Sequence, residues 1–251
     1  MMFRLIFRAF IASLVLTLAA CASYPPQKPA SDYPEPIFPA KRILPPGHDD
    51  QMSVYDPWEG MNKHIYNFNY HFDKAIFLPV VRGYKTVVPD FARTGIHNFF
   101  KNFDDMLSAV NSLLQLAPKK TAQSTGRVLV NSTVGLLGLI DVASMWGIPR
   151  PMEDFGQTMG RWGVGQGPYL VLPFLGPSNL RDGIGKLPDF YVRSMIQDEV
   201  LSDDVRIATT VAWPVDTRAN TSFRYYETGS AFEYRMVRWL YSTKRRLDVE
   251  Q

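Results

Sequence analysis

The feature that most constrains this chain is an uncharged segment, residues 162–180, that is crowded with residues that interrupt regular structure. Its interruptions are Gly163, Gly165, Gly167, Pro168, Pro173, Gly176 and Pro177. A membrane-spanning helix needs about 20 apolar residues, and it does not readily hold this many glycines and prolines. Irregular backbone in contact with hydrocarbon would leave costly unsatisfied polar groups. We therefore expect the segment to be buried in protein or to line a polar cavity at membrane depth.

Two further uncharged runs, residues 128–140 and 142–149, precede this segment. The five tryptophans of the chain lie around these runs, and they are Trp58, Trp146, Trp162, Trp213 and Trp239. Tryptophan and tyrosine favour the boundary between apolar and wet regions. Ordinary core packing explains aromatic residues equally well, so the composition leaves both interpretations open.

The N-terminus has the pattern of a secretory signal over residues 1–20. Arg4 and Arg8 give a positive start, an uncharged apolar run follows, and small residues precede Cys21. The sequence Leu18-Ala19-Ala20-Cys21 resembles the lipobox of bacterial lipoproteins. That resemblance implies cleavage before Cys21 and acylation of its sulfur and new amino group, which together form a stable anchor. Ala22, in place of an aspartate, favours the outer membrane.

The lipidated cysteine is followed by a polar, proline-rich stretch, so residues 21–53 are expected to form a tether. Proline fixes φ and removes a backbone donor, which prevents helix and sheet from propagating. The folded domain is expected to occupy residues 54–251 and to begin at Asp56-Pro57-Trp58-Glu59, a capping-box pattern.

The spacing of apolar residues predicts an all-α domain. Steps of three and four from Trp58 to Phe72 predict an amphipathic helix that stops near Leu78-Pro79. Further helices are expected over residues 80–87, over residues 89–103, after a cap at Asp104 or Asp105, and from Pro118. Two more are expected over residues 205–226, with a break or kink at Pro214, and over residues 230–246. Only residues 169–175 are expected to be extended.

Charge and motifs exclude several classes of function. Without residues 1–20, which carry two arginines and no acid, the formal charge of +3 falls to +1, so the chain has no electrostatic reason to bind nucleic acid. No Gly-x-Ser-x-Gly elbow or His-Glu-x-x-His motif is present. A metal site at His64, His71 and Asp73 is a weak alternative. The sequence predicts no enzyme, no cofactor and no metal centre.

Several longer segments resemble the MlaA family of lipoproteins, also called VacJ. They are Asp56-Pro57-Trp58-Glu59-Gly60-Met61-Asn62, Ile65-Tyr66-Asn67-Phe68-Asn69, Val130-Asn131-Ser132-Thr133-Val134-Gly135, Glu153-Asp154-Phe155-Gly156-Gln157-Thr158-Met159-Gly160, residues 163–173, Gly176-Pro177-Ser178 and Arg181-Asp182. The resemblance covers residues 55–190 and becomes looser in the tail. It fits the signal sequence and the lipobox as well.

This resemblance implies a ring-like helical protein embedded in the outer membrane, with an amphipathic central channel and no conventional transmembrane helix. It implies a lipid-anchored, periplasm-facing protein that removes mislocalised phospholipids from the outer leaflet. Trimeric porins and a soluble periplasmic carrier of the MlaC type are the implied partners. Two alternatives stay open, which are a phospholipid hydrolase and a structural porin-associated lipoprotein without transport activity.

The candidate residues of the lipid path come from the same segments, except for Arg161 and Lys186. Arg161, Arg181 and Lys186 are candidate phosphate partners, although salt bridges with Glu153, Asp154 or Asp182 explain them as well. Asn67, Phe68 and Asn69 are expected to help set a resting closed state, or else simply to pack and cap the first helix. The remaining candidates are Glu153, Asp154, Phe155, Gly156, Gln157, Gly163, Gly165, Gly167, Tyr169 and Asp182.

The basic tail is open to two interpretations. Phe232, Met236, Val237 and Leu240 lie on one side of a predicted helix, and arginines and lysines are mixed in or follow. Such a helix can touch lipid head groups or an acidic carrier. Solvated surface charge is the plainer explanation.

Overall fold

The computed structural model describes residues 52–227, 229–230 and 232–250, all within the larger of two compact units, Phe38–Gln251. The predicted signal sequence (residues 1–20), Cys21 and nearly all of the tether lie outside the described residues. Helices dominate the described part, as the sequence predicted, and none of these helices is long and apolar enough to cross a membrane.

The first helical stretch contains α2 (Glu59–Phe72), the π-helical turn η4 (Asp73–Phe77) and α3 (Leu78–Val87). The stretch is continuous, so the predicted stop near Leu78-Pro79 was wrong. Pro79 lies inside this stretch, at the second residue of α3, directly after the π-helical turn in which the hydrogen-bond pattern changes.

The start of α2 is fixed by tertiary contacts and not by the predicted capping box. Trp58 is the N-cap residue, and it makes no side-chain capping hydrogen bond. Asp56 instead accepts hydrogen bonds from the Tyr234 hydroxyl at 2.6 Å and from Arg238 Nη1 at 2.9 Å. The predicted cap is therefore an anchor for the C-terminal helix.

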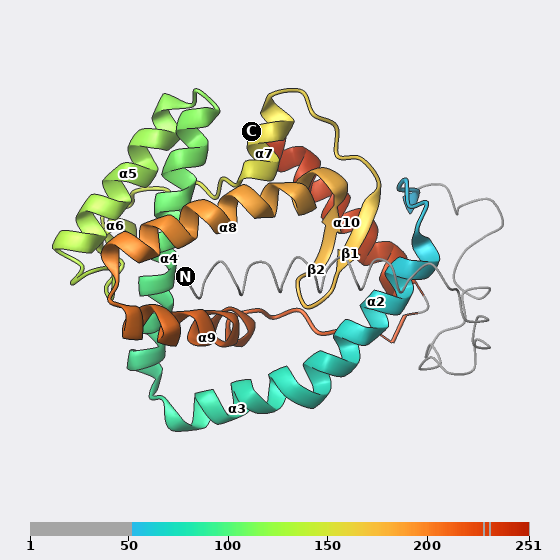
Figure 1. Ribbon diagram of the computed structural model, residues 1–251, viewed down its shortest axis with the longest axis horizontal. Coiled ribbons are helices and arrows are strands. Elements are labelled where there is room, and N and C mark those ends of the chain that lie inside the picture. The colour runs from blue at the N-terminus through green and yellow to red at the C-terminus, as the bar shows by residue number, and fades with distance from the viewer. Residues whose placement is uncertain (1–51, 228, 231, 251) are drawn as a thin grey trace. The chain divides into compact units, whose positions relative to one another are not determined.

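Helix α5 (Pro118–Thr133) packs against the C-terminal half of the longer helix α4 (Asp90–Leu114) (Figure 1). Pro118 starts α5 as predicted, but α4 is a single helix that no cap at Asp104 or Asp105 interrupts. Asp105 accepts from Arg127 Nε at 3.1 Å, and both side chains are at most 1% exposed. The aspartate thus joins two helices and does not begin one.

The remaining elements are α6 (Val142–Met145), α7 (Phe155–Arg161), β1 (Tyr169–Leu172), β2 (Gly176–Asn179), α8 (Leu180–Val200), α9 (Asp203–Ala219) and α10 (Glu233–Glu250). The strands form an antiparallel hairpin in which Tyr169 pairs with Asn179. The predicted extended segment contains β1 and its turn. Strand β2 and helices α7 and α8 were not predicted. Helix α9 continues through Pro214 without ending there, and it ends at Ala219.

The packing contacts of the described elements close into a circuit. Helix α2 packs on η4 and β1, α3 packs on η4 and α9, and α9 packs on α4 and α8. Helix α8 packs on α7 and on both strands, which leads back to α2 (Figure 1). Helix α10 joins the circuit through α7 and β2. Segments far apart in the sequence therefore depend on one another for their positions.

In the described part of the chain, polar side chains outnumber apolar ones in the interior, and many large apolar side chains lie on the surface. Its buried side chains include 23 polar or charged residues and 10 hydrophobic ones, whereas 38 large hydrophobic side chains are exposed. Water-soluble proteins have the opposite preference, and large exposed apolar areas mark interaction surfaces. The main buried apolar cluster is itself formed mostly by tyrosines, with Tyr66, Tyr169, Val171 and Tyr234 at its centre.

We expect replacement of Gly185 by alanine to destabilise the crossing of α7 and α8. A Cβ atom at Gly185 would lie 2.6 Å from the backbone nitrogen of Gly156 and 2.9 Å from its Cα. Overpacking against backbone costs about 1–3 kcal/mol. Thermal unfolding followed by circular dichroism measures this loss.

Gly126→Ala is the matched control, because Gly126 lies inside α5 and a Cβ there meets nothing within 4 Å. This variant should gain roughly 0.5–1 kcal/mol from helix propensity. Equal unfolding temperatures for Gly185→Ala and Gly126→Ala would contradict the close crossing.

Candidate functional site

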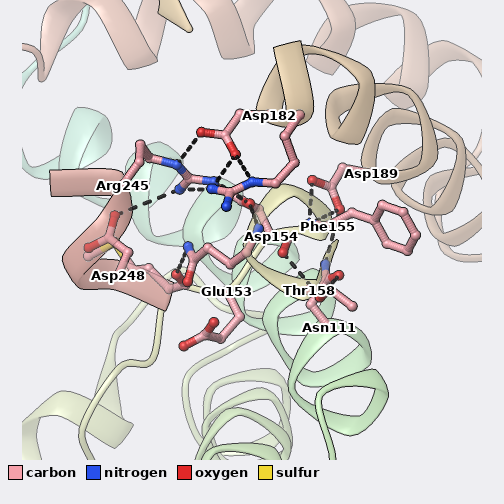
Figure 2. A network of polar contacts seen from close by, with 12 residues as sticks. Asn111, Glu153, Asp154, Phe155, Thr158, Asp182, Asp189, Arg245 and Asp248 are labelled. Carbon is pink, nitrogen blue, oxygen red and sulfur yellow. Dashed lines mark hydrogen bonds and ion pairs between the residues drawn. The ribbon is translucent and has the colours of Figure 1, made fainter. Parts of the chain in front are cut away.

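Asp182, in the first turn of α8, is the centre of a buried polar network (Figure 2). Its carboxylate accepts from Arg245 Nε at 2.7 Å, from Arg181 Nε at 3.0 Å and from the Tyr241 hydroxyl at 3.0 Å. Asn179 caps α8 by accepting from the backbone N–H of Asp182 at 2.8 Å. The network is therefore built around the start of a helix whose position the hairpin sets.

Arg245 of α10 reaches from Asp182 to Asp154 and so connects three helices. Its two terminal nitrogens donate to Asp154 at 2.8 and 2.7 Å, the two-bond geometry that suits a guanidinium and a carboxylate. Asp154 is also the N-cap of α7, because it accepts from the backbone N–H of Gln157 at 2.9 Å. A single side chain thus ties α10 to the N-terminal ends of α7 and α8.

The electrostatics of this network favour its charged form. Burial raises the pKa of Asp182, but hydrogen bonding and attraction from Arg245, together with Arg181, outweigh burial and leave the pKa below its ordinary value. Burial lowers the pKa of Arg245, but Asp182 and Asp154 more than compensate and raise it. Both partners therefore remain ionised in the protein interior.

Two more acids extend the network towards α4. Asp189 accepts from the Phe155 N–H at 3.0 Å and from Asn111 Nδ2 at 3.0 Å, and burial raises its pKa. Glu153 pairs with Lys120 Nζ at 2.7 Å. The polar region consequently runs from α10 through α7 to α4 and α5.

A cavity of about 590 Å³ lies beside the network, between α10 and the loop that follows α7. Gly163 in this loop has φ of +90° and Gly165 has open space around it, which allows the backbone to bend there and a ligand to come close. The lining residues are Ser53, Val54, Gly160, Gly163, Val164, Gly165, Gln166, Arg181, Trp239, Ser242, Thr243, Arg246, Val249 and Glu250. The cavity thus combines backbone, hydroxyl and guanidinium groups.

The hairpin is held on α2 by asparagine side chains. Asn69 donates to the carbonyl of Leu172 at 3.0 Å and accepts from the N–H of Phe174 at 2.8 Å, so it clamps the turn between the strands. Phe68 makes an edge contact with Phe174 at 5.3 Å between ring centres. Asn67 takes no part, and its buried Oδ1 has no hydrogen-bond partner among the described residues.

Asn62, about two turns before Asn69 on the same face of α2, makes the same kind of clamp at β1. Its Oδ1 accepts from the Val171 N–H at 2.8 Å, and its Nδ2 donates to the Tyr169 carbonyl at 3.0 Å. The spacing of seven between Asn62 and Asn69 is the only sequence signal that could have indicated both clamps. Tyr169 is 1% exposed, so it belongs to the core.

The structure thus divides the predicted site residues into separate groups. Glu153, Asp154, Phe155, Gly156, Gln157, Arg181 and Asp182 gather around the network, Gly163 and Gly165 line the cavity, and Phe68, Asn69 and Tyr169 lie at α2 and the hairpin. Arg161 and Lys186 are exposed and form no ion pair with a described residue. Gly167, with φ of +67°, packs near Leu180 outside the cavity lining.

The structure bears on two sequence-based interpretations of basic residues. Arg181 is bound to Asp182, as the salt-bridge explanation expected, and it is 5% exposed. Arg238 and Arg245 of the basic tail are buried and ion-paired, so solvated surface charge does not describe them. Their buried role was missed because they look like the other basic residues of the tail.

The weak metal alternative also fails in the described part of the chain. No group of three or more histidine, cysteine or acidic side chains there could hold a metal ion. Asp73, one of the three residues of that alternative, instead pairs with Arg218 at 2.6 and 2.8 Å.

The site and the fold define a mostly helical domain with an ion-paired polar interior and an apolar exterior. Residues 54–248 match the family model described as MlaA lipoprotein, and the chain belongs to that family. A protein of Escherichia coli K12, named intermembrane phospholipid transport system lipoprotein MlaA, is 40% identical over 147 residues, which are 57% of this chain and 59% of that protein.

Other proteins are also similar to this chain. An uncharacterized protein of Rickettsia felis is 43% identical over 131 residues, 52% of each chain. The chain spans about half the length of the curated relatives it matches. A solved structure from work on the structural basis for maintenance of bacterial outer membrane lipid asymmetry has a TM-score of 0.62 and 32% identity, and covers 78% of this chain and 100% of that one.

We expect Arg245→Ala to destabilise the domain by about 3 kcal/mol or more, because it leaves the buried Asp182 carboxylate without its main partner. The depressed pKa of Asp182 stabilises the fold at pH values above the ordinary carboxyl pKa, and this contribution is lost as the pH falls through the folded pKa. Denaturant unfolding at several pH values measures both effects, and the variant should unfold in acid at a higher pH than the parent.

Arg246→Ala is the control for this prediction, since Arg246 is the next residue along α10 and is exposed. Its stability should stay within about 0.5 kcal/mol of the parent. If the two variants lost equal stability, the network would not hold the three helices together.

Proposed function

We propose that this protein is an outer-membrane lipoprotein that removes mislocalised phospholipids from the outer leaflet. It passes them to a soluble periplasmic carrier of the MlaC type for retrograde transport and so maintains lipid asymmetry. Family membership and the name of the Escherichia coli relative support this function. The observation that carries it is the inverted distribution of side chains, with charged groups inside and large apolar side chains outside.

The proposed mechanism is passive and involves no covalent step. A phospholipid that changes leaflet must move its charged head group through hydrocarbon, and burying an unpaired charge is very costly. Polar groups that already line the cavity, such as Ser242 and Arg246, would meet this charge without rearranging. The head group would follow the polar interior while its acyl chains remain against the apolar exterior.

The closed circuit of packing contacts supports a ring around an amphipathic channel. The cavity beside Arg181 and the glycine loop is the proposed stretch of the lipid path in which a head group comes close to backbone. The exposed Arg161 and Lys186 are proposed to meet phosphate at its margins.

Anchoring and partners complete the proposal. Acylated Cys21 would hold the chain to the membrane, with residues 21–53 as a tether and the domain facing the periplasm. Trimeric porins are the proposed neighbours in the membrane. The broad exposed apolar surface supports contact with lipid or with such a partner.

The asparagine clamp at the hairpin turn is the proposed determinant of the resting closed state. Asn69 fixes the turn between β1 and β2 with two hydrogen bonds, and Phe68 packs on Phe174 in the same turn. Loss of the clamp would free the turn without removing any charged group. Asn67 lacks these contacts and provides a control on the same helix.

Deletion of the gene should raise the amount of phospholipid in the outer leaflet, measured by labelling surface-exposed amino head groups of intact cells. The parent gene should restore the normal level. The Cys21→Ala variant should not, because a protein without acyl groups at residue 21 lacks the membrane anchor. A normal level in the deletion strain would refute the transport function.

The same assay tests the clamp and the rival functions. Asn69→Ala should alter the outer-leaflet level in the presence of the intact anchor, whereas Asn67→Ala should leave it unchanged. Release of free fatty acid by the purified protein would favour a hydrolase. Full complementation by a variant with the cavity filled, such as Gly165→Trp, would favour a structural lipoprotein without a lipid path.

A further inference from the structure

A second cavity, of about 250 Å³, is lined by residues of α3, of α4 and of the end of α9, and by none of the network of α7, α8 and α10. Its lining residues are Tyr84, Lys85, Asp90, Arg93, Thr94, His97, Ala219 and Asn220. None of these residues belongs to the lipid path proposed above.

The basic side chains of this cavity come from two helices. Lys85 is exposed on α3, and its ammonium group forms no ion pair with a described residue. Arg93 of α4 donates from Nη1 to the carbonyl of Lys85 at 3.0 Å, which holds the guanidinium beside that lysine. Its Nη2 contacts Asp90, whose side chain is 90% exposed and therefore screened by solvent.

The third basic group, His97, is held in place by a contact with Asp216 of α9. Its Nδ1 lies 2.8 Å from Asp216 Oδ2 of α9, and Asp216 is 1% exposed. Tyr84 and Asn220 also donate to the Asp216 carboxylate, at 3.4 and 3.2 Å. The second ring nitrogen of His97 has no hydrogen-bond partner among the described residues, so it remains available to a ligand.

Two exposed apolar side chains lie within two residues, along the chain, of the cavity-lining Lys85 and Asp90. Val87, at the end of α3, is 79% exposed, and Phe91, in the first turn of α4, is 80% exposed. Basic groups beside projecting apolar groups suit the boundary of a lipid layer, where phosphates and acyl chains meet. A free anion would gain nothing from Val87 and Phe91.

We propose that this second cavity binds the phosphate of a lipid head group through Lys85, Arg93 and the protonated form of His97, in which both ring nitrogens donate. Donors from two helices converge on one oxyanion, and the charge-assisted bonds they offer are the strong kind. Val87 and Phe91 would contact the acyl chains of the same lipid. The site lies outside the transport path and does not depend on transport activity.

The test uses the full chain, purified in non-ionic detergent, and follows the imidazole resonances of His97 by NMR. Dihexanoyl phosphatidylglycerol should shift these resonances saturably, whereas dihexanoyl glycerol, which lacks phosphate, should not. Lys85→Gln should weaken binding roughly five-fold or more, and Arg93→Gln provides a second variant. Lys119→Gln is the matched control, because Lys119 is also exposed and forms no ion pair with a described residue.

Each other outcome overturns part or all of the proposal. Equal affinity for inorganic phosphate would make the site one for free anions and not for lipid. Equal affinity of Lys85→Gln and Lys119→Gln, or no saturable shift of His97, would remove the site altogether. Because His97 reports only on this cavity, failure here leaves the proposed transport function untouched, and loss of transport leaves this result unchanged.

Discussion

The structure depends on one interaction above all, the pairing of Arg245 with Asp182 and Asp154 inside the protein. Removing ions from water is costly unless each ion finds a well-aligned partner. Here one guanidinium meets two carboxylates, each of which also lies at the beginning of a helix. These ion pairs therefore fix the N-terminal ends of α7 and α8 relative to α10. In most domains apolar packing does this.

The polar interior explains why the surface is apolar. A chain with an ordinary share of hydrophobic residues, 46% here, must place them outside if its interior is filled by asparagine, aspartate and arginine. Side chains such as Leu129 on α5 and Phe190 on α8 are then exposed. Such a surface is stable only against lipid or another protein. The apolar exterior is thus a consequence of the charged interior, because the apolar residues have no other place in the fold.

Sequence alone predicted the helical class, the start of α5 and the extended segment at Tyr169, because these depend on local spacing and on proline. It predicted the wrong ends for α2 and α4, since Pro79 and Asp104 are tolerated inside helices once tertiary contacts fix the chain. Motifs singled out Asp154 and Asp182 as candidates for the lipid path, and both belong to the buried network; their place on a lipid path stays a prediction. Their partner Arg245 lies about 60 residues or more away in a basic tail, and no local pattern distinguishes a buried arginine from an exposed one.

The central claim is that a polar cavity open to water lies within a domain whose apolar surface contacts lipid. Single cysteines introduced by Gly165→Cys, in the cavity, and Leu129→Cys, on the surface of α5 and 61% exposed in the isolated domain, test it directly in outer-membrane preparations. A membrane-impermeant thiol reagent should label the first position and leave the second unlabelled. Fast labelling of the second position would mean that the apolar surface faces water, and would contradict the account.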